Sequence, residues 1–234
     1  MIPSGPLAGK TIVVTRPRAQ AAALAAAIEA AGGQALLFPL LEISPAADPA
    51  GLDRAVAELK NYRLAVFVSP NAVAYALPLI LAAGPWPAGL TPAAVGPGTV
   101  KALAERGIDG CLVPARRFDS EGLLELPELA ASRVAGQRVA IFRGDGGREL
   151  LAETLRQRGA QVDCLTCYRR SGPPLDSADL LDAEGRALLQ HTPVFVPHAR
   201  IAETARALGL DKIILTDAAD TGIIAGLGAY NWSA

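Results

Sequence analysis

Arginine, glycine, serine and threonine residues gather in the short loops that follow the predicted strands, and these residue types bind anionic oxygens. The loops lie at 15–18, 69–71, 96–99, 118–120, 143–146, 198–200 and 220–221. Guanidinium groups, hydroxyls and backbone N–H groups all donate hydrogen bonds to carboxylates and phosphates. In a parallel α/β sheet such loops meet at the carboxyl ends of the strands, where ligands bind. The sequence therefore predicts a site for an acidic ligand at this edge.

Two arginines, Arg16 and Arg143, each follow a predicted strand at equivalent places in two similar stretches of the chain. An arginine fork suits carboxylate recognition, although both residues could also be ordinary surface charges. Ser120 and Thr221 have a structural alternative too, because each is placed to cap a helix. Their functional interpretation depends on whether the fold brings them to one edge.

Tyr168 is the best proton donor in the sequence. A phenol is neutral at pH 7 and can protonate a leaving hydroxyl. The alternative is that its ring only packs between two parts of the fold. The two histidines, His191 and His198, support no Ser-His-Asp or Cys-His set. An enzyme with these residues would act mainly by holding an acidic substrate and its transition state.

The chain has three cysteines, Cys111, Cys164 and Cys167, an odd number that is typical of reduced thiols. Cys164 and Cys167 have redox-pair spacing, but they fall in an extended segment rather than at a helix N-terminus, where a thiol is activated. With two histidines and no second cysteine pair, a zinc site has little support. The glycines of 144–147 complete neither a P-loop nor a dinucleotide-binding motif. We predict neither a metal nor a cofactor.

The composition argues against several classes of protein. The chain has 234 residues, and its 22 basic and 23 acidic residues give a net charge of −1, whereas nucleic-acid binding needs a basic surface. The apolar stretches at 21–31 and 72–84 are too short to span a membrane, or carry a charge. The N-terminus lacks the pattern of a secretory signal. These features predict a cytoplasmic protein that binds neither nucleic acid nor membrane.

The elements that must position the loops occur twice. Each copy has a strand, a helix and an extended segment, at 11–15, 19–31 and 36–43 and again at 138–142, 149–158 and 161–168. Gly9 aligns with Gly136 and Gly32 with Gly159, both at an offset of 127, so the stretches form an internal repeat. Alternating strands and helices predict a parallel sheet covered by helices.

The two copies lose register further along. The turn and helix at 96–107 match 198–209 at an offset of only 102, so the second copy is shorter than the first by 25. A strand at 64–68 and a helix at 72–81 have no counterpart in the second copy. Either the chain has lost one βα unit, or the sequence leaves a segment out.

The repeat predicts an α/β fold of two flavodoxin-like parallel-sheet lobes joined by a two-stranded β ribbon. Lobe 1 is discontinuous and comprises 1–35 and 171–234. Lobe 2 comprises 45–160, and the ribbon comprises 36–44 and 161–170. The functional site is expected in the cleft between the lobes.

Several motifs follow one another in a specific order. They are Val-Val-Thr-Arg-Pro at 13–17, Phe-Pro-Leu-Leu-Glu-Ile at 38–43, Phe-Val-Ser-Pro-Asn-Ala at 67–72, Val-Gly-Pro-Gly-Thr at 95–99, Asp-Ser-Glu-Gly at 119–122 and Cys-Tyr-Arg-Arg at 167–170. In this order and spacing the chain resembles the uroporphyrinogen-III synthase family over nearly its whole length.

The resemblance implies a cofactor-free lyase that acts as a monomer. Its substrate would be hydroxymethylbilane, a linear tetrapyrrole with eight carboxylates, and its product uroporphyrinogen III, formed with inversion of ring D. Loss of the hydroxyl gives an azafulvene, and attack on it gives a spiro intermediate that fragments and recloses. Eight carboxylates suit the donor-rich loops.

The resemblance also carries roles over to positions of this chain. Tyr168 corresponds to a tyrosine on the ribbon that aids departure of the hydroxyl. The positions that correspond to substrate-binding loops are Arg16, Ser69, Gly96, Ser120, Arg143, Arg200 and Thr221.

The chain departs from the family pattern where the second copy of the repeat is shorter. Family members carry a strand and a serine-containing loop there, and the normal spacing on each side of Ala183 favours a left-out segment over a true deletion. Two other functions stay open. One is a non-catalytic two-lobed module that binds an acidic small molecule or tetrapyrrole, and the other is a nucleotide-dependent α/β enzyme.

Overall fold

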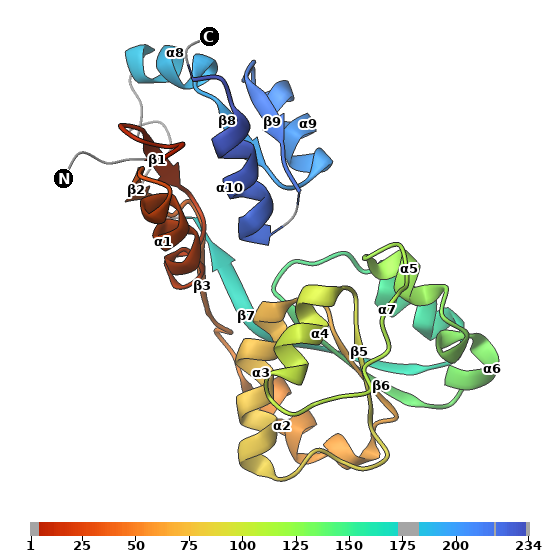
Figure 1. Ribbon diagram of the computed structural model, residues 1–234. Coiled ribbons are helices and arrows are strands. Elements are labelled where there is room, and N and C mark those ends of the chain that lie inside the picture. The colour runs from red at the N-terminus through yellow and green to blue at the C-terminus, as the bar shows by residue number, and fades with distance from the viewer. Residues whose placement is uncertain (1–4, 173–182, 218, 233–234) are drawn as a thin grey trace. The chain divides into compact units, whose positions relative to one another are not determined.

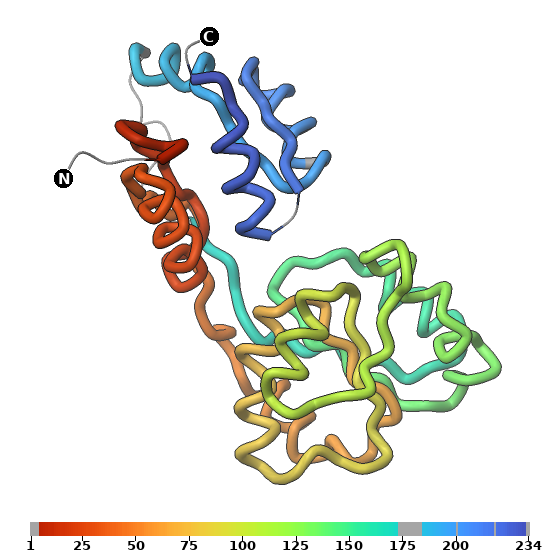
Figure 2. The backbone as a smooth tube through the Cα atoms, in the orientation of Figure 1, coloured from red at the N-terminus to blue at the C-terminus, as the bar shows by residue number. Residues whose placement is uncertain are grey.

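The computed structural model describes residues 5–172, 183–217 and 219–232 (Figure 1). It divides into two compact units, which we call the terminal unit (Met1–Glu42 with Ser171–Ala234) and the central unit (Ile43–Arg170). The two ends of the chain, far apart in sequence, therefore fold together in the terminal unit (Figure 2).

The central unit contains a five-stranded sheet in the order β3-β7-β6-β4-β5. Its strands are β3 (Glu42–Pro45), β4 (Leu64–Phe67), β5 (Thr91–Ala94), β6 (Arg138–Gly144) and β7 (Gln161–Ser171). β6 pairs in parallel with β4 and β7, and β4 pairs in parallel with β5. All four residues of β4 are buried, as expected for a parallel strand covered on both faces.

Helices cover both faces of this sheet. One core contains side chains of α2 (Ala50–Ala57), α3 (Pro70–Ala83) and α4 (Pro97–Ala104). The other contains side chains of α5 (Ser120–Leu124), α6 (Ala131–Val134) and α7 (Leu150–Gln157). Short 3-10 turns occur at Leu59–Asn61 and Pro127–Leu129. Alternate strand residues belong to opposite cores: Phe67 stacks on Phe142 at 4.7 Å in the first core, and Val66 lies in the second.

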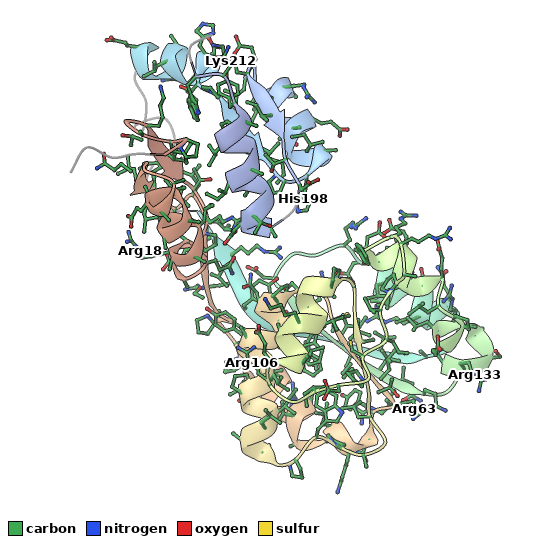
Figure 3. All side chains as sticks on the ribbon, viewed as in Figure 1. Arg18, Arg63, Arg106, Arg133, His198 and Lys212 are labelled. Carbon is green, nitrogen blue, oxygen red and sulfur yellow. The ribbon has the colours of Figure 1, made fainter. Side chains whose placement is uncertain are left out.

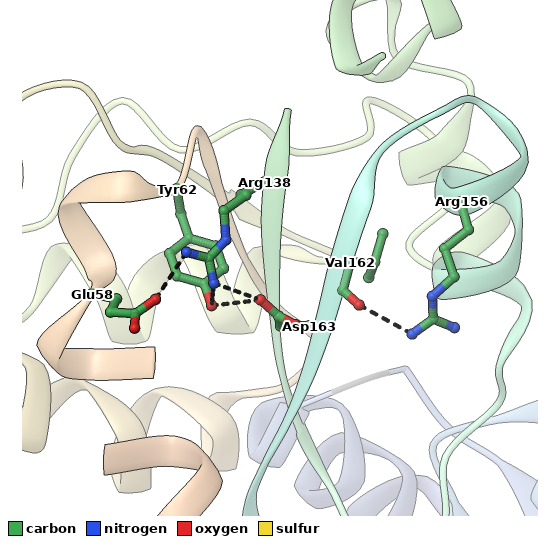
Figure 4. Close-up of polar contacts among 6 residues, drawn as sticks. All are labelled: Glu58, Tyr62, Arg138, Arg156, Val162 and Asp163. Atoms are coloured by element: carbon green, nitrogen blue, oxygen red, sulfur yellow. Dashed lines mark hydrogen bonds and ion pairs between the residues drawn. The ribbon is translucent and has the colours of Figure 1, made fainter. Parts of the chain in front are cut away.

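An ion-pair cluster lies where β6 and β7 begin (Figure 4). Arg138 donates hydrogen bonds to Glu58 (2.9 Å), Tyr62 (2.8 Å) and Asp163 (3.1 Å), and its guanidinium lies 4.2 Å from the Tyr62 ring centroid. The Tyr62 hydroxyl donates to Asp163 at 2.6 Å. Burial, and then this hydrogen bond, raise the pKa of Tyr62 to about 12. The cluster links α2 and both strands at the edge opposite the predicted site.

The terminal unit has two separate pairs of parallel strands. β1 (Thr11–Val14) pairs with β2 (Gln34–Leu37), and β8 (Val194–Val196) pairs with β9 (Ile213–Leu215). The helices are η1 (Arg18–Gln20), α1 (Ala22–Ala30), α8 (Ala183–His191), α9 (Ala199–Ala207) and α10 (Ala219–Ala229). The buried core joins β1 to α1 and α10 through Val14, Leu24, Ile28, Ile223 and Leu227.

The predicted parallel α/β organisation is confirmed, with two differences in detail. The extended segment predicted at 36–43 is interrupted, because Pro39 lacks an N–H for a ladder and lies between β2 and β3. The helix predicted at 19–31 begins as a 3-10 turn, and α1 starts at Ala22.

The predicted extended conformation of the cysteine pair is confirmed in β7. Cys164 packs toward one core and Cys167 belongs to the other, a placement that does not favour a redox pair.

The predicted shortfall falls partly outside the described residues, because 173–182 are not among them. Between β3 and β5 the chain forms α2, β4 and α3, whereas between β7 and β8 the described residues form α8 alone.

Candidate active site

Tyr168 lies at the carboxyl end of β7, and its side chain is fully buried in the central unit. Its hydroxyl oxygen Oη accepts a hydrogen bond of 2.7 Å from Nη2 of Arg170 and lies 3.0 Å from Oγ of Ser69. The Tyr75 ring stacks on the Tyr168 ring with centroids 6.0 Å apart, and the Tyr75 hydroxyl donates to the carbonyl of Ile43 at 3.0 Å. The phenol is therefore held by contacts on both its ring and its oxygen.

A β-bulge directs Tyr168 toward Ser69. The β6–β7 ladder pairs Arg143 with Thr166 and then Gly144 with Tyr168, so that one extra residue, Cys167, is accommodated in β7. The Tyr168 ring lies directly against Gly144, where a Cβ atom would approach ring carbons at 2.7 Å. Gly144 therefore has a packing role rather than only the turn role that its sequence context suggests.

Ser69 connects the end of β4 with the beginning of α3. It is the N-cap residue, and its Oγ accepts a hydrogen bond of 3.1 Å from the backbone N–H of Ala72. Pro70 follows at the first helical position, which requires no N–H. Unlike Tyr168, Ser69 is partly exposed, so its hydroxyl can meet a ligand.

A small cavity of about 100 Å³ lies beside this group. The polar side chains around it belong to one serine and three arginines, namely Ser120, Arg143, Arg148 and Arg170. Gly144 and Gly147 contribute backbone to its wall. The lining has the donor types that the sequence predicted for an acidic ligand.

The Arg143 side chain is held rigidly. It is 9% exposed and forms an ion pair of 2.8 Å with Glu149. Burial opposes its charge, but Glu149 outweighs burial and raises the pKa of Arg143 above its ordinary value. A Cβ on Gly147 would lie 2.6 Å from its Nη2 atom, so the backbone packs closely against the guanidinium.

Ser120 and Gly96 also lie at this edge of the sheet. Ser120 lines the cavity, but the interpretation of Ser120 as the N-cap is wrong, because the side chain of Asp119 accepts from the N–H of Gly122 at 2.8 Å. Gly96 caps α4 after β5, and a Cβ there would come within 3.3 Å of Phe118. A Gly96 side chain is thus disfavoured by the close approach of the neighbouring loop.

The remaining predicted residues belong to the terminal unit. Arg16, after β1, forms an ion pair with Asp220, which brings it next to Thr221. Thr221 is exposed and lies within the first turn of α10, so its interpretation as an N-cap is also wrong. Arg200 lies in the first turn of α9, after His198 (Figure 3). The side chain of Arg200 is outside the part of the structure that is described.

Arg170 is a candidate site residue that the sequence reasoning missed. It lines the cavity and contacts Tyr168, and none of the ion pairs among the described residues includes it. A signal was present in the sequence, because residues two apart on a strand share a face. The motif at 167–170 therefore places Arg170 beside Tyr168.

A larger cavity, about 480 Å³, lies at the opposite edge of the central sheet. It is lined by residues at the beginnings of β4, β5 and β6, and by Arg63 and Arg133 (Figure 3). Ligands of parallel α/β sheets bind at the carboxyl ends of strands, which favours the smaller cavity as the functional one.

Within the described ranges no group of His, Cys, Asp and Glu residues is arranged to hold a metal ion. No helix in those ranges is long and apolar enough to cross a membrane.

The fold and the site together define a parallel α/β protein with an arginine-lined cavity and a buried phenol at the carboxyl ends of its strands. The uroporphyrinogen-III synthase HemD family matches residues 22–188. The chain is 33% identical to the uroporphyrinogen-III synthases of Salmonella typhimurium and Escherichia coli, in each case over 90% of this chain and 96% of the relative. The chain belongs to the uroporphyrinogen-III synthase family, whose members are cyclising lyases of haem biosynthesis.

Solved structures agree with the fold. A mutant uroporphyrinogen III synthase from Thermus thermophilus matches 93% of this chain, with a TM-score of 0.60 and 19% identity, and the match covers 97% of that protein. The wild-type protein in a second crystal form matches 96% of this chain and 91% of its own, with a TM-score of 0.54 and 21% identity.

The alignment with the Salmonella protein contains more positions than this chain contributes residues. It runs over 240 positions but includes 90% of the 234 residues, which is about 211, so about 29 positions have no residue in this chain. The corresponding value for the Escherichia coli alignment of 238 positions is about 27. Both values are close to the shortfall of 25 in the second copy of the repeat.

Proposed function

We propose that this chain catalyses the cyclisation of hydroxymethylbilane to uroporphyrinogen III, with inversion of ring D. The observation that carries the proposal is the match of nearly the whole chain to two synthases at 33% identity. Family membership favours this activity over a non-catalytic binding module. The reaction needs no redox change, and the proposed enzyme uses no cofactor. It acts as a monomer in the cytoplasm.

The proposed enzyme has two flavodoxin-like lobes, 1–35 with 171–234 and 45–160, joined by a ribbon of 36–44 and 161–170. Substrate carboxylates bind the loops that follow the strands in both lobes. In the central unit the donors are Arg143, Ser120, Ser69 and the backbone at Gly96, and in the terminal unit they are Arg16, Arg200 and Thr221. A substrate with eight carboxylates suits a site that has several cationic and hydroxyl donors.

Departure of the substrate hydroxyl requires a proton, and the hydrogen bonds around Tyr168 suggest its route. Arg170 has only donors, so the phenol proton cannot be directed toward it. Ser69 is the other neighbour of Oη, and it is partly exposed whereas Tyr168 is fully buried. In this proposal Ser69 protonates the leaving hydroxyl while Tyr168 passes its own proton to Ser69.

The proton transfer leaves a negative charge on Oη of Tyr168, which the adjacent guanidinium of Arg170 stabilises. The hydroxyl leaves as water and the substrate becomes an azafulvene. Attack on the azafulvene forms the spiro intermediate, which fragments and recloses to the inverted ring. The proton that the reclosed pyrrole loses as it regains aromaticity returns through Ser69 to Oη of Tyr168, which restores the phenol. The arginines hold the acetate and propionate side chains through these steps, so that the ring carbons stay close together.

The proposal is tested by incubating the chain with hydroxymethylbilane and identifying the product isomer. Uroporphyrinogen III is expected. If the only product is the spontaneously formed uroporphyrinogen I, the chain is not a synthase and the binding module becomes the better description.

A further inference from the structure

The carboxylate of Asp145 continues the β6–β7 ladder past the point where β6 itself ends. β6 ends at Gly144, whereas β7 runs on to Ser171. The backbone N–H of Asp145 donates to the carbonyl of Tyr168 at 2.9 Å. In a regular parallel ladder the carbonyl of Asp145 would then accept from the N–H of Arg170. The side chain accepts in its place, with Oδ1 at 3.0 Å from that nitrogen.

The turn that follows Asp145 explains why its side chain takes over from its backbone. Gly146 has a φ of 56°, a left-handed conformation that favours glycine, and the chain leaves the sheet there toward α7. A short carboxylate side chain reaches backbone groups near its own position without needing the strand to continue. It thus provides a partner for an N–H that the end of β6 would leave without one.

Asp145 braces the segment of β7 that carries the phenol and the guanidinium of the candidate site. Successive side chains of a strand point to opposite faces. Accordingly, Nε of Arg169 donates to Oγ of Ser44 at 2.8 Å, whereas Nη2 of Arg170 donates to Oη of Tyr168 at 2.7 Å. The two hydrogen bonds of Asp145 reach the backbone on either side of Arg169. They therefore hold both ends of the short segment from which Tyr168 and Arg170 project.

The Asp145 carboxylate bonds to the main chain of Arg170 and does not form an ion pair with its guanidinium. In the described part of the chain, no ion pair joins any carboxylate to Arg170. Arg143 differs, because its guanidinium is paired with Glu149 at 2.8 Å. Asp145 can thus fix the place of Arg170 while the positive charge of the side chain stays directed to Oη of Tyr168.

We propose that Asp145 is a positioning residue, which holds Arg170 against the hydroxyl of Tyr168 through the Arg170 main chain. The inference rests on the proposed function, in which the Arg170 guanidinium stabilises the negative charge that develops on Oη. Without Asp145, the guanidinium would be less well placed when that charge forms. Because the charge exists only after proton transfer, the loss falls on kcat rather than on KM.

The first test compares Asp145→Ala with Asp145→Asn, since asparagine keeps an acceptor oxygen at the place of Oδ1. We expect kcat to fall about tenfold in Asp145→Ala with little change in KM, and to stay within about twofold of wild type in Asp145→Asn. Asp48→Ala is the matched control, because Asp48 is also exposed and accepts from a backbone N–H, that of Ala50, at 2.9 Å. This control should leave kcat unchanged.

A double-mutant cycle separates positioning from a general structural role. A structural defect would lower kcat in any background, so Asp145→Ala is also made in Arg170→Gln. If Asp145 acts through Arg170, its loss has no further effect on kcat once the guanidinium is gone. Losses of kcat that multiply independently in the double variant would overturn the proposal.

Amide hydrogen exchange at Arg170, measured without substrate, is independent of the synthase activity. We expect exchange at this amide about tenfold faster in Asp145→Ala than in wild type, and at the wild-type rate in Asp145→Asn. Unchanged exchange in Asp145→Ala would overturn the proposal. If the wild-type chain forms no uroporphyrinogen III, the proposed function fails, and the exchange result alone decides whether Asp145 holds Arg170.

Discussion

Arg170 and Tyr168, two residues apart on the same face of β7, form a hydrogen bond of 2.7 Å between Nη2 and Oη. Arginine can only donate, so the phenol proton does not point to Arg170, and we propose that it points to Oγ of Ser69, which lies 3.0 Å from Oη. In this proposal the three residues form a chain of donors that begins at the guanidinium of Arg170 and ends at the partly exposed hydroxyl of Ser69.

Replacing Tyr168 by Phe removes the second member of this chain and leaves the ring packing in place. We expect kcat to fall about 100-fold, at the lower end of the usual contribution of an acid–base group. Tyr75→Phe is the matched control, because it removes a hydroxyl from the stacked neighbour without touching Oη. Equal turnover in wild type and Tyr168→Phe would remove the catalytic role.

Ser69 has two functions that can be separated by two substitutions. Ser69→Ala removes the proton donor and the helix cap, and should lower kcat as well as cost about 1 kcal/mol of stability. Ser69→Thr keeps a hydroxyl and should restore most of both. Steady-state kinetics and denaturant unfolding measure the two effects. A full loss of stability with unchanged kcat in Ser69→Ala would limit Ser69 to capping.

Arg143 is expected to contribute to substrate binding. Arg143→Gln removes a charge-assisted hydrogen bond worth about 2 kcal/mol, so kcat/KM should fall about 30-fold. The partner Glu149 is half exposed, which limits the cost of leaving it unpaired. Arg106→Gln is the control, since the Arg106 side chain, in the turn after α4, donates to the carbonyl of Ala102 in that helix. A similar change in both variants would indicate a general charge effect.

Gly144 should tolerate no side chain. Gly144→Ala places a Cβ within 2.7 Å of the Tyr168 ring, and such overpacking costs about 1–3 kcal/mol. Gly51→Ala is the control, because Gly51 lies exposed in α2 with open space around its Cβ, and helix propensity favours Ala. Unfolding experiments should show opposite signs for the two variants. A neutral Gly144→Ala would mean that the ring can move freely.

The stability of the central unit should depend on alkaline pH through Tyr62. Its pKa is raised from 10.0 to about 12, so the folded protein retains the phenol proton that the unfolded chain releases first. The stabilisation is complete below pH 10 and is lost as the pH rises toward 12. Tyr62→Phe should have lower stability at neutral pH and a flatter decline above pH 10 in denaturant titrations. An identical decline in both proteins would contradict this assignment.

Much of the fold follows from the sequence because its signals are local. The β-branched run Thr11–Val14 and the apolar run Leu64–Phe67 predict buried strands. Both runs form strands, but only Leu64–Phe67 is buried throughout, whereas Thr11 and Val13 are exposed. Glycines mark the helix ends. The repeat adds long-range information, since equal offsets imply equal elements. The interruption at Pro39 shows the limit, because an extended segment does not reveal where its hydrogen bonds are broken.

The site was less predictable, because it depends on register. Arg143, Ser120 and Tyr168 were expected at one edge, and the structure gathers Arg143 and Ser120 around one cavity with Arg170. Burial of Tyr168 depends on a bulge at Arg143 and Gly144, which no local pattern indicates. The prediction that Ser120 and Thr221 cap helices is wrong because α5 begins at Ser120 itself and α10 begins at Ala219. The exact first residue of a helix is hard to predict from sequence.

The central claim is that this chain directs ring D inversion, and the isomer formed from hydroxymethylbilane tests it most directly. Purified chain, the Tyr168→Phe variant and a protein-free control are incubated with the substrate, and the products are separated as isomers I and III. The account predicts mainly uroporphyrinogen III with the chain, a slower rate with the variant and isomer I without protein. Formation of isomer I alone in the presence of the chain, at the protein-free rate, would contradict it.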